Sequence, residues 1–236
     1  MRICVLGSCG KTKAVNHHKA PTCEDLDTHE KIKFWRKGLS ERQLYAGMMY
    51  TGNQARELNK GIAKLRSISE LKVDYFIISA GFGMLNEEDK IPPYDCSFTG
   101  MKKSEIEFRS EILNIPSDFE KIQAKGYELM YLALGKDYLT SLGNEWYSNP
   151  TQKIVCFQRK MKADHITNIS GNSRIVRAYS KSGHKVHGVL GFKGDLLRIL
   201  ADHALKQESP FEEVRSWLSP QHFYDLFYSL GNLQRP

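Results

Sequence analysis

The chain has 236 residues, a length that suits one domain of generous size. Hydrophobic residues make up 41 % and aromatic residues 11 %, which is enough for a sizeable buried core and argues against intrinsic disorder. Lysine and arginine outnumber aspartate and glutamate by 34 to 27, and this excess of positive charge invites a polyanionic partner such as nucleic acid or an acidic membrane surface.

The hydropathy pattern and the cysteines indicate the compartment. No apolar run approaches the roughly 20 residues that a membrane helix needs, and the first apolar stretch is too short for a signal peptide. The five cysteines show no tight pairing pattern. We therefore expect reduced thiols in a cytoplasmic protein that has no membrane partner.

In the first half of the chain, alternating patterns predict two strands and several helices. A short buried strand is expected at 2–7, followed by a polar, basic loop over 8–38. Apolar residues near helical spacing predict a helix over 41–66, divided by Gly47 and Gly52. The run 73–79 is apolar on both faces and predicts a central parallel strand, with a Gly/Pro-rich loop after it at 80–100.

The second half continues the alternation. Helices are expected at 102–113, 117–124, 137–142 and 195–206, and strands at 127–134 and 153–158. The stretch 175–190 holds β-prone pieces and is harder to assign. Ser209-Pro210 and Ser219-Pro220 each look like a helix cap followed by proline at the first helical position.

Strands that alternate with helices predict an α/β fold, a three-layer sandwich with a mostly parallel central sheet. Because we find no internal repeat and no low-complexity linker, we expect a single domain over residues 1–236. Ligands of such sheets bind outside the carboxyl ends of the strands. We therefore expect the loops 7–11, 79–83 and 134–137 to meet over one site.

The turn after the first strand, Gly7-Ser8-Cys9-Gly10-Lys11-Thr12, invites comparison with a P-loop. That motif needs a glycine five residues before Gly10, and this position holds Val5. The loop is too short for an NTPase, but either a phosphate contact by the backbone and Lys11 or a plain tight turn fits it.

The most informative stretch runs from Ser79 to Asp95. Gly81 and Gly83 remove side chains where a strand reaches its crevice, so a flat ligand would fit against the backbone there. Two prolines stiffen the return and present Tyr94 and Asp95. An aromatic ring beside a carboxylate suits a base and its sugar; the alternative is a structural Asp95 that caps the helix near Lys102, with Tyr94 as core filler.

At these residues the chain resembles a small bacterial and phage domain family that is related to the uracil-DNA-glycosylase-like fold and to a domain of archaeosine synthases. The motifs are Gly-x-Cys after the first strand with a lysine nearby, Leu44-Tyr45-Ala46-Gly47, Ile78-Ser79-Ala80-Gly81-Phe82-Gly83-Met84-Leu85 and Pro93-Tyr94-Asp95. The resemblance covers residues 2–100 and extends through 191–194.

The family is associated with enzymes that act on modified or 7-deazaguanine bases. Within it, the chain is most similar to antiphage DNA glycosylases that remove glucosylated hydroxymethylcytosine. It lacks the Gly-Gln-Asp-Pro-Tyr-His and His-Pro-Ser types of motif found in ordinary uracil glycosylases, so the resemblance does not point to uracil as the substrate.

Positive charge is concentrated in one later stretch. Between Arg159 and Lys193, eight lysines and arginines stand against a single acid, Asp164. Glycines and serines leave backbone N–H groups free for phosphates, so we prefer a phosphate-tracking surface to a merely solvated basic face. The residues expected at phosphates are Lys11, Arg174, Arg177, Lys185 and Lys193.

The hypothesis from sequence is a monofunctional DNA glycosylase that flips a modified base of double-stranded DNA into the crevice and leaves an abasic site. Asp95 is expected to stabilise the charged sugar and to orient water, and Phe82 or Tyr94 to stack on the base. The base and its adduct are expected to contact Ser79, Gly81, Gly83, Ser8 and Cys9. The loops 8–38 and 86–100 are long enough to form a roomy pocket.

Several alternatives stay open. One is a base-exchanging transglycosylase or another modified-base enzyme, and another is a nucleic-acid-binding module without enzymatic activity. A lyase variant would use the amine of Lys11 or Lys193 as nucleophile. The histidines and cysteines complete no metal-binding frame and no histidine is placed by sequence to activate Cys9, so no metal and no cofactor are expected.

Overall fold

The structure, a computed structural model, describes residues 1–15, 17–158 and 163–234. Its centre is a six-stranded sheet with the strand order β4-β3-β1-β6-β7-β8. The five parallel strands are β1 (Arg2–Ser8), β3 (Lys72–Ser79), β6 (Leu129–Leu132), β7 (Lys153–Cys156) and β8 (Ile166–Asn168). The sixth strand, β4 (Gly83–Asn86), pairs antiparallel with β3 at one edge.

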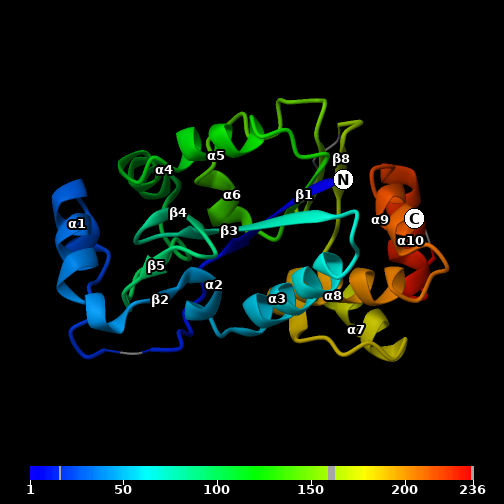
Figure 1. Ribbon diagram of the computed structural model, residues 1–236, viewed down its shortest axis with the longest axis horizontal. Helices are drawn as coiled ribbons and strands as arrows, with labels where there is room; N and C mark the ends of the chain where they lie inside the picture. Colours follow the sequence, from blue (N-terminus) through cyan, green and yellow to red (C-terminus); the bar gives the residue numbers. More distant parts are fainter. Residues whose placement is uncertain (16, 159–162, 235–236) are drawn as a thin grey trace.

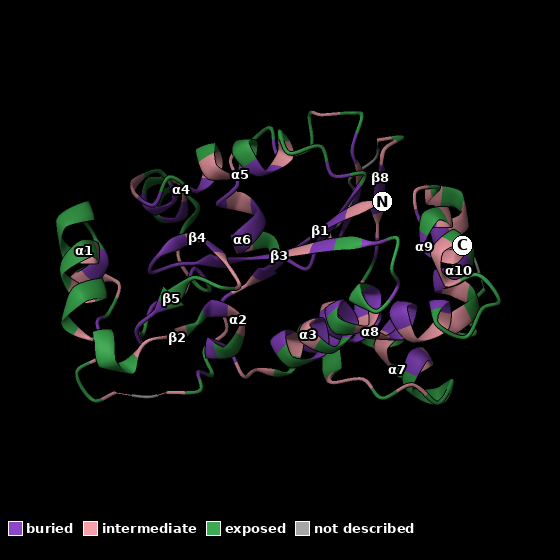
Figure 2. Cartoon of the chain, in the orientation of Figure 1, coloured by how far each residue is buried: buried purple, intermediate pink, exposed green. Residues whose placement is uncertain are grey.

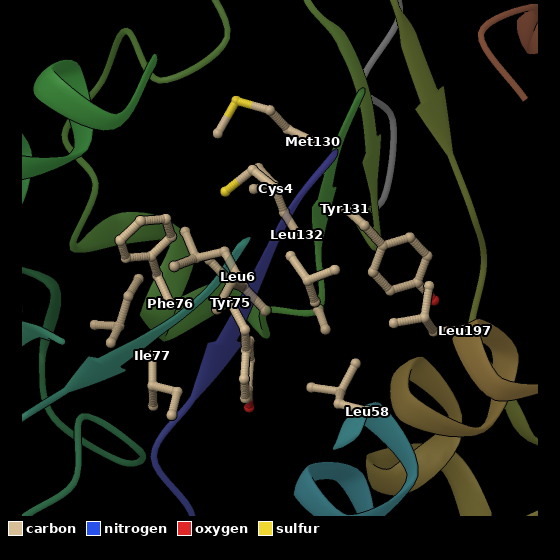
Figure 3. Packing of buried hydrophobic residues seen from close by; sticks show 14 of the residues in the cluster. Cys4, Leu6, Leu58, Tyr75, Phe76, Ile77, Met130, Tyr131, Leu132 and Leu197 are labelled. Carbon is tan, nitrogen blue, oxygen red and sulfur yellow. The ribbon is translucent and has the colours of Figure 1, made fainter. Parts of the chain in front are cut away.

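The central strands are apolar on both faces because helices cover both sides of the sheet. The parallel register sets Leu6 opposite Phe76 on one face and Val5 opposite Tyr75 on the other. Figure 3 shows Leu58 and Leu197, from two helices below the sheet, near the rings of Tyr75 and Tyr131. The Tyr131 hydroxyl also donates a 2.7 Å hydrogen bond to a helix carbonyl, that of Lys193.

The helices form one layer on each side of the sheet (Figure 1). One layer holds α3 (Asn53–Arg66), α7 (Ser173–Lys181) and α8 (Gly188–Ala204), and the other holds α4 (Lys103–Ile112), α5 (Ile115–Gln123) and α6 (Lys136–Thr140). Two further helices, α9 (Pro210–Ser216) and α10 (Pro220–Leu230), lie beside the β8 end. The expected α/β sandwich with a mostly parallel sheet is confirmed.

Two expected loops contain regular structure. The stretch 8–38 holds the 3-10 turn η1 (Glu24–Leu26) and the helix α1 (His29–Gly38), and 80–100 holds β4 and β5 (Lys90–Ile91). The helix α1 has no fully buried residue (Figure 2), and only Ile32 and Trp35 pack part-buried against the core, so its apolar signal in the sequence is short. The strand β5 is two residues long, too short for a periodic signal.

Two helical assignments also change. The region 41–66 contains η2 (Ser40–Arg42), β2 (Leu44–Tyr45) and α2 (Ala46–Met49) before α3, and β2 pairs with β5. The stretch 175–190, expected to hold β-prone pieces, instead forms most of α7 and the start of α8. In α7 the β-branched Ile175 faces the core together with Tyr179, four residues on, so tertiary burial overrides local β propensity.

No helix among residues 1–15, 17–158 and 163–234 is long and apolar enough to cross a bilayer.

Candidate functional site

The loops that follow β1, β3 and β6 meet at Cys9, as expected for the carboxyl edge of the sheet. The Cys9 N–H donates to the carbonyl of Ile78 at 2.9 Å, and the Tyr138 hydroxyl donates to the carbonyl of Cys9 at 3.1 Å. The Cys9 Sγ also lies 3.0 Å from that hydroxyl. Chain segments far apart in sequence are thus joined at one buried point.

Next to Cys9 is a buried network of three hydroxyl groups. The Ser79 hydroxyl donates to the Tyr94 hydroxyl at 2.7 Å, and the Tyr50 and Tyr94 hydroxyls are also 2.7 Å apart. Ser79 Oγ accepts the N–H groups of Gly81 and Phe82 at 3.2 and 3.0 Å. Burial raises the pKa of both tyrosines, so their hydroxyls remain protonated and available as donors.

Lys13 lies against this network, and its side chain is one that the sequence analysis missed. Its Nζ is 4.3 Å from the centroid of the Tyr94 ring, and it makes a long 3.4 Å hydrogen bond to the carbonyl of Gly10. Only 9 % of Lys13 is exposed. Burial lowers the pKa of its amine, although the neighbouring Cys9 and Asp95 oppose this shift.

The backbone explains why Lys13 turns inward. It forms a β-bridge with Tyr50, and the flanking hydrogen bonds join Thr51 N to Thr12 O and Ala14 N to Met49 O. In the sequence, the only signal is a second lysine two positions after Lys11, and nothing local distinguishes the two. The bridge to a segment 37 residues away decides which of them is buried.

Asp95 is exposed at the rim of this cluster. Its backbone N–H donates to the carbonyl of Pro21 at 2.8 Å, and it forms a β-bridge with Thr22. Its carboxylate makes no hydrogen bond or ion pair within the described part of the chain, and it lies close enough to the Lys13 amine to interact with it electrostatically. The alternative in which Asp95 caps the helix near Lys102 is wrong, because within the described residues no hydrogen bond joins its carboxylate to the first turn of that helix, and Glu105 of the helix itself accepts the Lys102 N–H at 2.7 Å.

The other residues expected at the substrate are mostly buried, which corrects the expectation of an open crevice. Ser79, Gly81, Phe82, Gly83, Tyr94 and Cys9 are all buried, while Ser8 is half-buried and its hydroxyl accepts from the Gln54 amide at 3.3 Å. Tyr94 is a core residue, as the structural alternative held.

The two glycines serve packing in this structure. A Cβ on Gly81 would lie 2.8 Å from the Tyr94 ring, and one on Gly83 would lie 2.8 Å from the carbonyl of Leu113. Close approach by other parts of the chain, rather than by a flat ligand, therefore accounts for both. Phe82 lines a cavity of about 210 Å³ beside α1, and the Arg36 guanidinium lies 5.3 Å from its ring centroid.

Residues 21–26, here called the covering segment, lie over this buried cluster. Cys23 forms a disulfide with Cys96, so the expectation that all thiols are reduced is wrong; Cys4, Cys9 and Cys156 are free and buried. The two partners are 73 residues apart in sequence, which is why no spacing pattern indicated the pair. Leu26 of this segment lies against Gly81, next to the ring of Tyr94.

Arg109 of α4 binds the backbone of the covering segment. Arg109 is 8 % exposed, and its guanidinium donates to three carbonyls, at 2.6 Å to Ala80, 2.9 Å to Cys23 and 3.1 Å to Leu26. Three charge-assisted hydrogen bonds from one planar group fix the covering segment relative to the end of β3.

The residues expected at phosphates fall in two places. Lys11 is exposed near the Lys13 turn, whereas Arg174, Arg177 and Lys185 are exposed on or after α7. Lys193 is half-buried, with its Nζ 5.9 Å from the Phe157 ring centroid, and burial lowers its pKa. The basic residues Arg159, Lys160 and Lys162 lie outside the described residues.

A cavity of about 320 Å³ opens at the carboxyl ends of β7 and β8. Phe157, Ser170, Gly171 and Ser173 at the start of α7 belong to its wall. With neighbouring strands about 4.8 Å apart, β8 lies roughly 14 Å from β1 along this edge. The cavity and Asp95 therefore both lie on the side of the sheet where the parallel strands have their carboxyl ends.

A group of Glu57, His187 and Asp195 has ligand atoms within 4.8 Å of one another and was not anticipated. Both carboxylate oxygens of the buried Asp195 accept from His187, through its backbone N–H and its Nδ1, each at 2.7 Å. Glu57 is paired with Lys60 and Arg198. Because each carboxylate is engaged and two cations are adjacent, the group suits a brace between α3 and α8 better than a metal site.

A cavity of about 700 Å³ lies elsewhere, between α2, α3 and the turn after β4. Tyr45, Met48 and Glu88 are in its wall, and Arg66 there is already bound to Glu87 and to the carbonyl of Val73. The size is within the range of ligand pockets, but the motif residues discussed above do not line it.

Comparison with known proteins adds no assignment: no protein-family model matches the chain, and no match was found among curated proteins.

Proposed function

We propose that the protein is a DNA glycosylase that hydrolyses the N-glycosidic bond of a flipped-out modified base, with Asp95 as the catalytic carboxylate. The observation that carries this proposal is that Asp95 is exposed and its carboxylate makes no hydrogen bond to described residues, at the edge of the sheet where α/β proteins bind ligands. The resemblance of the Ser79–Asp95 stretch to base-processing enzymes supports the same chemistry.

The chemistry needs one anionic group beside the sugar. When the glycosidic bond breaks, positive charge develops on the deoxyribose, and a carboxylate close to it stabilises that charge. The same carboxylate orients water toward C1′ and takes its proton. Asp95 is anchored through its backbone to Pro21 and Thr22, which leaves its side chain free for this role.

The exposed cations of α7 suit the DNA backbone. Arg174 and Arg177 stand three residues apart on this helix, near the cavity at the ends of β7 and β8. These two guanidinium groups would bind phosphates of the DNA that flanks the flipped nucleotide.

Base recognition requires the covering segment to shift. Phe82 and Tyr94 are 5 % and 2 % exposed, and Leu26 lies over Gly81 beside them. Stacking of either ring on a base therefore depends on movement of residues 21–26, whereas Asp95 is accessible without it.

The test is incubation with double-stranded DNAs that carry different cytosine and guanine modifications, beginning with α-glucosylated hydroxymethylcytosine, and detection of abasic sites and released base. Asp95→Asn should keep DNA affinity and lower excision by about 10²-fold, the scale of losing a key electrostatic or proton-transfer group. Arg174→Ala with Arg177→Ala is the matched comparison and should weaken binding to every DNA instead.

Unchanged excision by Asp95→Asn would remove this residue from the mechanism. The competing functions give other outcomes of the same assay. A transglycosylase would leave a strand that carries a new base and resists alkaline cleavage, and a binding module would bind DNA without releasing base.

A further inference from the structure

We infer that the amine of Lys13 is a nucleophile that forms a Schiff base with the abasic sugar, which gives the protein a lyase activity in addition to base excision. This inference rests on the site proposed above. It assigns a role to a buried side chain that hydrolysis by Asp95 and water does not use.

The surroundings of Lys13 suit a neutral amine. An ammonium group carries three N–H donors, but the Nζ of Lys13 has a single long hydrogen bond, 3.4 Å to Gly10, within the described residues. The face of the Tyr94 ring, 4.3 Å away, attracts an ammonium group, but it does not supply the hydrogen bonds that water gives an exposed amine. Burial therefore opposes the charged form, and the lowered pKa of this amine agrees with that geometry.

The position of Lys13 relative to Asp95 is what a lyase needs. Asp95 follows Tyr94, whose ring contacts the amine, and its charge acts on Lys13. A sugar held against Asp95 would thus bring C1′ to the same group of residues. Exposed lysines elsewhere are protonated at neutral pH, with roughly one molecule in three thousand carrying a free amine at an ordinary pKa.

The two lysines considered from sequence fit less well. Lys11 is exposed to solvent rather than buried beside Asp95. Lys193 is half-buried, but its amine lies beside Phe157 at the end of β7, roughly 10 Å along the sheet from β1. Lys13 combines burial with proximity to Asp95.

The reaction balances without a cofactor. The Nζ lone pair of Lys13 attacks the C1′ aldehyde of the abasic site, loss of one water leaves an imine, and a proton from solvent converts the imine to an iminium ion. Asp95 accepts a proton from C2′, and the electron pair expels the 3′ phosphate as the C3′–O bond breaks. Water then adds to C1′, and the lysine leaves as the free amine.

The test uses an oligonucleotide in which the abasic site is made beforehand by another enzyme, so that no base has to be excised. The protein is mixed with this DNA at pH 7 in borohydride, which reduces the iminium to a stable protein–DNA cross-link. We expect a cross-linked band with the unmodified protein, at least a tenfold weaker band with Lys13→Gln, and an unchanged band with Lys206→Gln, whose lysine is exposed and lies outside the proposed site. Peptide mapping of the unmodified protein should find the adduct on Lys13.

Absence of a cross-link with the unmodified protein, or an adduct that maps to another amine, overturns the inference. The mapping needs no variant, so a folding defect in Lys13→Gln does not obscure the answer. Base release without trapping would leave the glycosylase standing and remove the lyase. Trapping on Lys13 without release of base from any modified DNA would support the lyase activity and remove the proposed glycosylase activity.

Discussion

At the scale of single residues, the candidate site contains a buried lysine whose amine makes a single long hydrogen bond within the described residues. Lys13 is placed by backbone pairing with Tyr50, and its amine lies on the Tyr94 ring. Because its pKa is lowered in the folded state, protonation of this group favours unfolding. The same burial that suits chemistry therefore reduces stability at neutral pH.

This lowered pKa predicts a pH-dependent effect of Lys13→Met. At a pH below the folded-state pKa the amine is charged in the folded and in the unfolded protein, and the free-energy cost of burying the charge is fully present. This cost decreases as the pH rises toward the unfolded-state pKa, which is near 10.4. The melting temperature of Lys13→Met relative to the unmodified protein should thus be higher at pH 7 than at pH 9.5. Lys11→Met, at an exposed position, is the control and should show no such trend. A Lys13→Met difference that is equal at both pH values would contradict the assignment.

At the scale of elements, β4 and α4 approach each other so closely that a side chain has no room between them. Gly83 opens β4 with φ of 80°, and a Cβ there would lie 2.8 Å from the carbonyl of Leu113, which ends α4. Gly100 has a similar φ of 90° but nothing within 4 Å of its Cβ position. The two glycines share backbone conformation and differ in surroundings.

Alanine substitution should separate these two contributions. Gly100→Ala should cost about 1 kcal/mol of unfolding free energy from left-handed strain, and Gly83→Ala roughly 3 kcal/mol because a backbone clash is added. Urea unfolding measures both. Equal losses for the two variants would show that β4 moves away from α4 without cost.

At the scale of the whole molecule, a disulfide joins distant parts of the chain around the site. Cys23 belongs to the covering segment and Cys96 follows Asp95, so the bond closes a loop between partners 73 residues apart. Together with Arg109 it holds the N-terminal region against the end of β3. Loss of this bond should loosen the cover over Tyr94 and reduce stability.

Reduction of the disulfide with dithiothreitol should lower the free energy of unfolding by about 4 kcal/mol on the loop-closure model. The measurement is urea unfolding with and without the reductant. The double variant Cys23→Ser with Cys96→Ser is the control, since its unfolding midpoint should not respond to reductant. An unmodified protein whose midpoint is also unaffected would mean that the bond does not stabilise the fold.

Local patterns found those elements whose signal lies within a few residues. The runs around β1 and β3 are apolar on both faces, which only a covered central strand requires. The two Ser-Pro pairs predicted the starts of α9 and α10; the Ser219 side chain accepts the His222 N–H as a cap, whereas the Ser209 side chain makes no capping hydrogen bond. The helix α7 was not predicted because Ile175 and Val176 favour strands locally. Its helical conformation is determined by packing against the rest of the protein.

For the candidate site, the sequence alone determined that the strand ends would meet and that Asp95 would stand on a proline-backed return. Only the tertiary structure decided that Lys13 rather than Lys11 is buried, that Phe82 and Tyr94 lie beneath a cover, and that Cys23 and Cys96 are joined. The physical reason is that strand and turn signals arise from neighbouring residues. Burial and cross-linking depend on contacts between segments tens of residues apart, and no local pattern encodes them.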